Sequence, residues 1–133
     1  MLLLDICKYL QARTDVGEEI TAGTLEESRT RCIGVYENRN LGAENRPRIG
    51  GLSCTKYFEK GVSIRVHWTN DTTEAEKKAQ EIHRLFFGVS NVKMGKYLVS
   101  YFDAKDPQWM GRTENGICEY VVPVKIIYRT EES

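Results

Sequence analysis

The sequence lacks an excess of charge of either sign, because 19 lysines and arginines balance 19 aspartates and glutamates in its 133 residues. Proteins that bind nucleic acid usually carry a basic excess, since neutralised phosphates supply much of their affinity. The balance therefore gives no reason to expect specific binding to DNA or RNA. It is compatible with self-association, because neighbouring copies repel one another little.

Long apolar runs are also missing. Residues Met1–Leu4 are apolar, but Asp5 and Lys8 interrupt them at once, whereas a secretory signal needs a basic stretch and then a longer apolar run. No window approaches the roughly 20 apolar residues that a membrane-spanning helix needs. We therefore expect no membrane interaction and a cytosolic protein with reduced thiols.

Motifs that would carry chemistry are absent too. Structural zinc sites usually show closely spaced ligand pairs, and the sequence has neither a Cys-x-x-Cys nor a His-x-x-x-His pair. Phosphate-binding glycine loops and the G-x-S-x-G motif do not occur. We therefore expect no metal, no cofactor and no enzyme. An enzymatic alternative would use Cys54, expected near a loop, or His67. The apolar positions of Cys7 and Cys118 favour the core.

The hydrophobic periodicity predicts one domain, residues 1–133, of the α+β class. Apolar residues recur at helical spacing near the N-terminus and again between Asp71, a candidate N-cap, and Gly88. Alternation predicts strands elsewhere, and Pro123 predicts an edge position or a bulge in the last of them. We expect one mixed or antiparallel sheet of about four to five strands with two helices packed on one face, which leaves sheet surface for a partner. The expected strands are 18–22, which would be short, 31–36, 55–69, 96–102 and 117–130.

Two polar connectors stand out, Glu37–Gly51 and Asp103–Gly116. The first holds Arg39, Arg46 and Arg48, which either touch a carboxylate or phosphate of a neighbour or belong to a solvated loop. The second holds Trp109 and Met110, which either fold back on the core or anchor an interface, where tryptophan and methionine are enriched.

Several segments, in this order and spacing, resemble the small minor capsid and tail-terminator proteins of tailed bacteriophages. They are Cys32–Glu37 (CIGVYE), the strand ending Ile64–Trp68 (IRVHW), the helix Ala79–Phe86 (AQEIHRLF) followed by Gly88–Asn91 (GVSN), the stretch Pro107–Gly116 (PQWMGRTENG) and the strand end Val124–Arg129 (VKIIYR). The N-terminal helix fits the same pattern. The resemblance spans most of the chain.

The resemblance implies a structural protein. Tail terminators are α+β domains that assemble as hexameric rings, cap the growing tail tube, halt its polymerisation and present a surface to the head connector. Expected partners are therefore other copies, the tube protein and the connector, in a virion assembled in the bacterial host cytoplasm, with the genome passing through the ring. The residues expected at contacts between subunits or with the tube are Arg46, Arg48, Trp109, Met110 and Arg112. Another head–tail connector, a minor capsid protein and a non-viral binding module remain alternatives.

Overall fold

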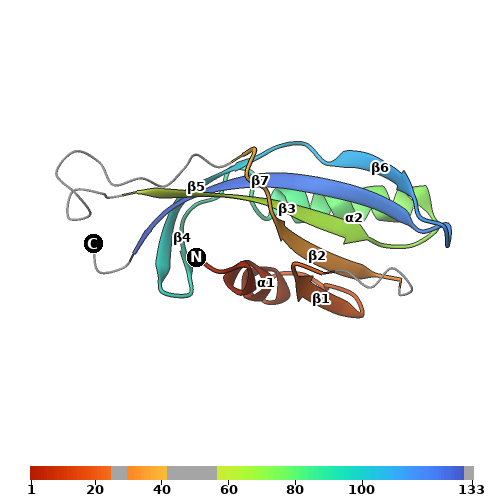
Figure 1. Cartoon of the computed structure of the whole chain (residues 1–133), viewed down its shortest axis with the longest axis horizontal. Helices are drawn as coiled ribbons and strands as arrows, with labels where there is room; N and C mark the ends of the chain where they lie inside the picture. Colours follow the sequence, from red (N-terminus) through yellow and green to blue (C-terminus); the bar gives the residue numbers. More distant parts are fainter. Residues whose placement is uncertain (25–29, 42–56, 131–133) are drawn as a thin grey trace.

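The computed structural model describes residues 1–24, 30–41 and 57–130, which form two helices and a seven-stranded sheet (Figure 1). The elements, in chain order, are α1 (Leu3–Gln11), β1 (Glu19–Ala22), β2 (Cys32–Glu37), β3 (Phe58–His67), α2 (Thr72–Arg84), β4 (Ser90–Met94), β5 (Tyr97–Ala104), β6 (Gln108–Arg112) and β7 (Cys118–Thr130).

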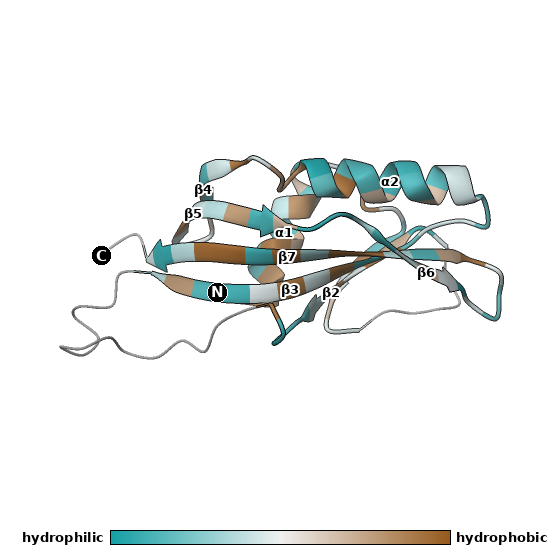
Figure 2. Cartoon of the chain, turned by 90° about the horizontal axis from the view of Figure 1, so that it is seen from above, coloured by the Kyte–Doolittle hydropathy of each residue, from teal (hydrophilic) through white to brown (hydrophobic). Residues whose placement is uncertain are grey.

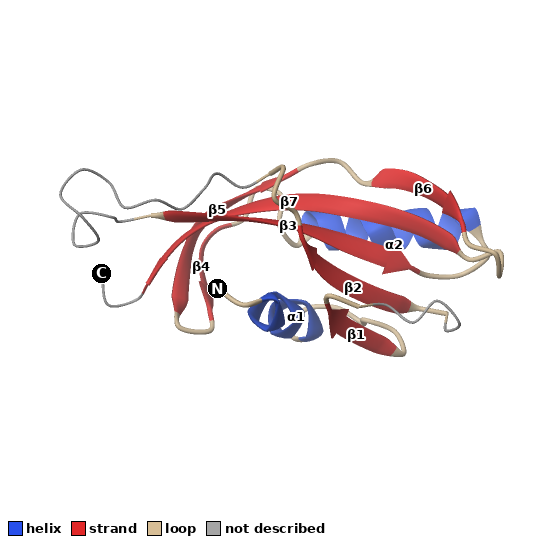
Figure 3. Ribbon diagram, viewed as in Figure 1, coloured by secondary structure: helices blue, strands red, loops and turns tan. Residues whose placement is uncertain are grey.

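The long strand β7 organises the sheet, whose order is β1-β2-β3-β7-β5-β4 with β6 also paired to β7 (Figure 3). Strands β1 and β2 are parallel, and the other pairs are antiparallel. On one side β7 pairs with β3 along its length. On the other side β5 pairs with its C-terminal half and β6 with its N-terminal half. The sheet is therefore mixed, and β7 lies in its interior.

Pro123 occupies the middle of this interior strand, paired with Ser63 without a register shift, so the expected edge position or bulge is wrong. Its carbonyl accepts a hydrogen bond from the Lys105 amide at 2.9 Å, just after β5 ends. The nitrogen and carbonyl of one strand residue point to the same side. The nitrogen of Pro123, which carries no hydrogen, therefore points towards the gap between β5 and β6. No described strand residue there requires a hydrogen-bond donor from β7.

One face of the sheet packs against both helices. On β3 the alternating residues Val62, Ile64 and Val66 are fully buried, as their period of two predicts. They join the helix residues Ile6 and Ile82 in one core cluster. Figure 2 shows the outcome in colour: α2 is mostly hydrophilic, whereas the middle of β7 is hydrophobic. The opposite face of β2, β3 and β7 is called here the helix-free face.

The aromatic centre of the core joins both helices to β5. The ring of Phe86, just after α2, lies 5.3 Å from that of Tyr9 on α1 and 5.1 Å from that of Phe102 on β5. The Tyr9 hydroxyl donates to the Leu85 carbonyl at 2.6 Å, and burial raises the pKa of Tyr9. These contacts fix the two helices relative to the sheet.

The expected number of strands, four to five, is wrong because β4 and β6 were missed. Neither shows a clean alternation of apolar residues. In β4, Asn91 has a φ of 55°, outside the extended region. In β6, a register shift separates Trp109 from Gly111, whose φ is 99°. The segment Asp103–Gly116, expected to be a connector, thus contains a bulged strand.

The start of α2 follows its sequence signal only in part. The Asp71 carboxylate accepts a hydrogen bond from the Thr73 amide at 2.9 Å, so Asp71 is the N-cap. The Glu74 carboxylate instead accepts from the Thr69 hydroxyl at 3.0 Å. Both contacts bind the first turn of α2 to the chain that leaves β3.

Candidate assembly surfaces

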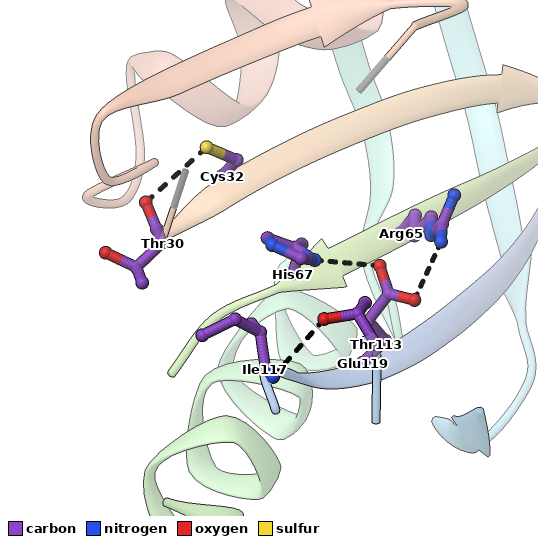
Figure 4. Close-up of polar contacts among 7 residues, drawn as sticks. All are labelled: Thr30, Cys32, Arg65, His67, Thr113, Ile117 and Glu119. Carbon is purple, nitrogen blue, oxygen red and sulfur yellow. Dashed lines mark hydrogen bonds and ion pairs between the residues drawn. The ribbon is translucent and has the colours of Figure 1, made fainter. Parts of the chain in front are cut away.

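Three charged or ionisable side chains, two of them buried, form a network on the helix-free face (Figure 4). The Arg65 guanidinium donates to Glu119 Oε1 at 2.7 Å, and Glu119 Oε2 lies 2.9 Å from His67 Nδ1. His67 is fully buried and Glu119 is 6 % exposed. A carboxylate only accepts hydrogen bonds, so Nδ1 donates. One buried carboxylate thus ties two residues of β3 to β7.

The network keeps Arg65 charged and in place. Its hydrogen bond to Glu119 holds the pKa of Arg65 above the ordinary value, and a bond to the Tyr36 hydroxyl adds to the effect. Gly34 makes room for Tyr36, because a Cβ at Gly34 would lie 2.7 Å from the tyrosine ring. Tyr36, Arg65, Glu119 and His67 therefore form one connected polar row across β2, β3 and β7.

A groove of about 410 Å³ lies along this row. Met110 of β6 reaches into it with a 59 % exposed side chain. The groove combines an aromatic ring, a thioether and an ion pair. Its chemistry suits contact with another polypeptide. The lining residues are Tyr36, Glu37, Ser63, Arg65, Met110, Glu119 and Val121.

A second groove lies between α2 and the β5–β6 segment, with a volume of about 340 Å³. Trp109, 48 % exposed, flanks it and packs edge-on against Tyr120 with ring centroids 5.3 Å apart. Phe87, 64 % exposed, stacks on His83. The lining residues are Glu76, Gln80, His83, Arg84, Asp106, Pro107 and Tyr120.

Trp109 and Met110 thus leave β6 on different sides. Trp109 is paired with Tyr120 of β7 and contacts its ring, whereas Met110, in the bulge, lines the groove of the helix-free face. A bulge re-aims side chains in this way. The molecule therefore presents two different half-apolar surfaces from adjacent residues of one exposed strand.

The family model for the bacteriophage tail terminator protein matches residues 9–130, which include α2 and all seven strands. The chain belongs to the bacteriophage tail terminator family. The resemblance seen in the sequence is thereby confirmed. No curated protein matches the chain significantly. The terminator is a structural protein of the phage tail, and its family membership indicates a role in tail assembly rather than catalysis.

The structure places the predicted contact residues of the terminator in different settings. Arg46 and Arg48 lie outside the described residues. Trp109 and Met110 are exposed on opposite sides of β6. Arg112 is exposed, but its guanidinium donates to the carbonyls of Asn70 at 2.9 Å and Gly116 at 3.1 Å. Arg112 therefore holds the β6–β7 turn against the chain that enters α2.

Sequence reasoning missed the buried network of the terminator. Alternation on β3 placed His67 and Arg65 on the polar face, towards solvent or a neighbour, yet His67 is fully buried. The sequence did hold one indication of this network: Glu119 lies among the polar positions of a second expected strand and could pair with His67. Recognising it requires the register of β3 against β7, in which His67 faces Glu119.

The remaining candidates for chemistry lie in the core or outside the described residues. Cys7, Cys32 and Cys118 are buried, and burial raises the pKa of the Cys7 thiol. Cys54 lies outside the described residues. Within residues 1–24, 30–41 and 57–130, no three metal-ligating side chains gather, and no helix is long and apolar enough to cross a membrane.

Proposed function

We propose that this terminator assembles as a ring of identical subunits, a hexamer, on the end of the tail tube. The ring stops tube polymerisation and offers its other side to the head–tail connector. Its place is the tail or the head–tail joint of the virion, and it is assembled in the host cytoplasm without a catalytic step. The observation that carries the proposal is the family match over residues 9–130.

The two surfaces that flank β6 support this proposal. A ring of identical subunits needs a contact between two different patches of the same chain, and a cap needs further contacts with the tube and the connector. Trp109 and Met110 face different sides, so they serve different neighbours. Both side chains are about half exposed or more, as suits residues that become buried on assembly. Arg46 and Arg48 are proposed for the same contacts on sequence grounds alone.

Addition of the protein to polymerising tail tubes tests the proposal. We expect the tubes to stop lengthening, and negative-stain microscopy to show a ring of closed symmetry on one end of each tube. A matched incubation with bovine serum albumin should leave tube length unchanged. Tubes that grow equally long with the terminator present, and that carry no extra density at either end, would rule out capping. A monomer in isolation is compatible with the proposal, because the tube supplies the template.

A further inference from the structure

Strand β6 forms an open edge of the sheet. Within the part of the chain that the structure describes, β6 pairs with β7 alone (Figure 3). Four of its five residues are exposed, namely Gln108, Trp109, Met110 and Arg112. An open edge presents backbone N–H and C=O groups with which a further strand can pair.

The hydrogen bonds of β7 show which backbone groups of β6 point outwards. The Cys118 amide donates to the Thr69 carbonyl at 2.8 Å, and the Cys118 carbonyl accepts from the Trp68 amide at 3.2 Å. Both bonds lie on the β3 side of β7, so Arg112, which lies opposite Cys118, forms a non-hydrogen-bonded pair with it. The amide and carbonyl of Arg112 therefore point away from β7.

The same alternation applies to Trp109. Its partner Tyr120 lies two residues beyond Cys118 on β7, so the backbone of Tyr120 also faces β3. The amide and carbonyl of Trp109 thus point outwards as well. The edge offers two short sets of hydrogen-bonding groups, one on each side of the bulge that separates Trp109 from Arg112.

The side chains of β6 do little to prevent pairing at this edge. Charged side chains on an edge strand oppose the addition of another strand. Arg112 is the one charged residue of β6, and its guanidinium is turned back onto the carbonyls of Asn70 and Gly116. Trp109 and Met110 instead flank the edge with apolar surface on its two faces.

The two ends of the main sheet order, β1 and β4, are placed differently. The helix α1 lies between them and contacts both strands (Figure 3). A helix laid against a sheet edge is one way in which proteins keep that edge from pairing. Among the described strands, a second copy therefore offers β6 only another β6 as an open edge. Such a pair would be two-fold, which does not generate the head-to-tail contacts of a ring.

We propose that β6 binds an extended segment of the tail tube protein, which adds to the sheet as a further strand. The inference rests on the proposed ring and names the contact that holds the ring on the tube. The outward amides and carbonyls of Trp109 and Arg112 bond the main chain of the segment. Its side chains lie alternately on the two faces of the sheet, beside Trp109 and Met110, so uncharged and apolar residues suit the segment.

Capture of a strand also gives the ring a means of stopping growth. A segment of the last tube subunit that is paired with β6 is not available to the next tube subunit. The tube, whose growth the ring has to stop, is therefore the occupant of this edge, in preference to the head–tail connector.

Amide hydrogen exchange, resolved to single residues by mass spectrometry, tests the contact on the intact chain. On tail tubes the Trp109 and Arg112 amides should exchange at least about tenfold more slowly than in the unbound protein, because each then donates to a partner. The Thr113 amide is the internal control and should change little, because it already donates to the Ile117 carbonyl at 3.0 Å. Unchanged exchange at Trp109 and Arg112 on capped tubes would overturn the strand addition and leave capping intact.

A proline in place of Trp109 removes the outward amide without removing a hydrogen bond to β7. Trp109→Ala is the matched control, because it also lacks the indole but keeps the amide. Trp109→Pro should bind tubes at least about fivefold more weakly than Trp109→Ala, as expected for the loss of one hydrogen bond. Thermal unfolding first confirms that both variants are folded. Equal binding of the two folded variants would contradict pairing at this edge.

Photo-cross-linking identifies the polypeptide that lies beside β6. The exposed residue Gln108 is replaced by p-benzoylphenylalanine, and rings on tail tubes are irradiated. A product that joins the terminator to the tube protein supports the proposal. A product that joins two terminators would assign the edge to the neighbouring subunit and overturn it. A wild-type chain that does not bind tubes at all would contradict the proposed function together with this contact.

Discussion

Replacement of Glu119 by alanine should lower the free energy of unfolding by about 3–5 kcal/mol, the usual cost of removing one partner from a buried ion pair. The carboxylate is 6 % exposed and serves Arg65 and His67 at once. Its loss removes the carboxylate that the arginine and the fully buried imidazole both contact. Urea denaturation followed by circular dichroism measures the difference.

Two further variants separate the charge from the packing. Glu119→Gln keeps the shape and one acceptor oxygen but removes the charge, so it should cost less than alanine. Glu59→Ala removes the partner of Lys125, at 3.3 Å on the same two strands, where both side chains are about 30 % exposed. It should cost less than about 1 kcal/mol, because ion pairs in which both partners reach solvent contribute little. Equal effects of Glu119→Ala and Glu59→Ala would contradict the structural role of the buried network.

Trp109→Ala should weaken the contact between subunits about 30-fold, which corresponds to the roughly 2 kcal/mol typical of an interface anchor. Trp109 packs on Tyr120 beside the groove between α2 and the β5–β6 segment, so truncation removes a large exposed apolar surface there. The fold should be unaffected, because the indole is 48 % exposed. Sedimentation of rings with tail tubes at a series of protein concentrations measures the change.

Met110→Ala is the matched comparison, one residue away. Met110 reaches into the groove on the helix-free face, so it should leave the subunit contact intact and weaken binding to the tube or the connector instead. Indistinguishable effects of the two substitutions on ring formation would show that the opposite orientations of these side chains have no separate roles.

The elements that the sequence predicts well are those in which burial follows one regular period. The alternation on β3 and β7 and the apolar stripe on α2 each reflect a single face against the core. The strands β4 and β6 escaped because their backbones depart from that regularity. Asn91 has a positive φ, and the bulge at Met110 breaks the alternation of β6. Each pairs with the strand that follows it in the chain, so the irregular backbone rather than a distant partner hid the pattern.

The sequence predicted which large apolar residues lie at the surface, but not the direction in which each side chain points. Trp109 and Met110 stood out as large apolar residues among polar ones, and both are exposed. Their opposite orientations arise from the bulge and required coordinates. For His67 the sequence predicted the wrong environment. Its alternation on the strand predicted contact with solvent or a neighbour, but the side chain is buried and hydrogen-bonded to the Glu119 carboxylate on the paired strand. The family resemblance depended on segment order and spacing, which is why it survived these errors.

The length of tails assembled without this protein tests its central role most directly. Deletion of the gene from its phage, followed by electron microscopy of the lysate, should yield tails of widely varying and excessive length, and expression of the intact chain in trans should restore a single length. Tails of normal length that merely lack heads would contradict termination and would identify a joining protein instead.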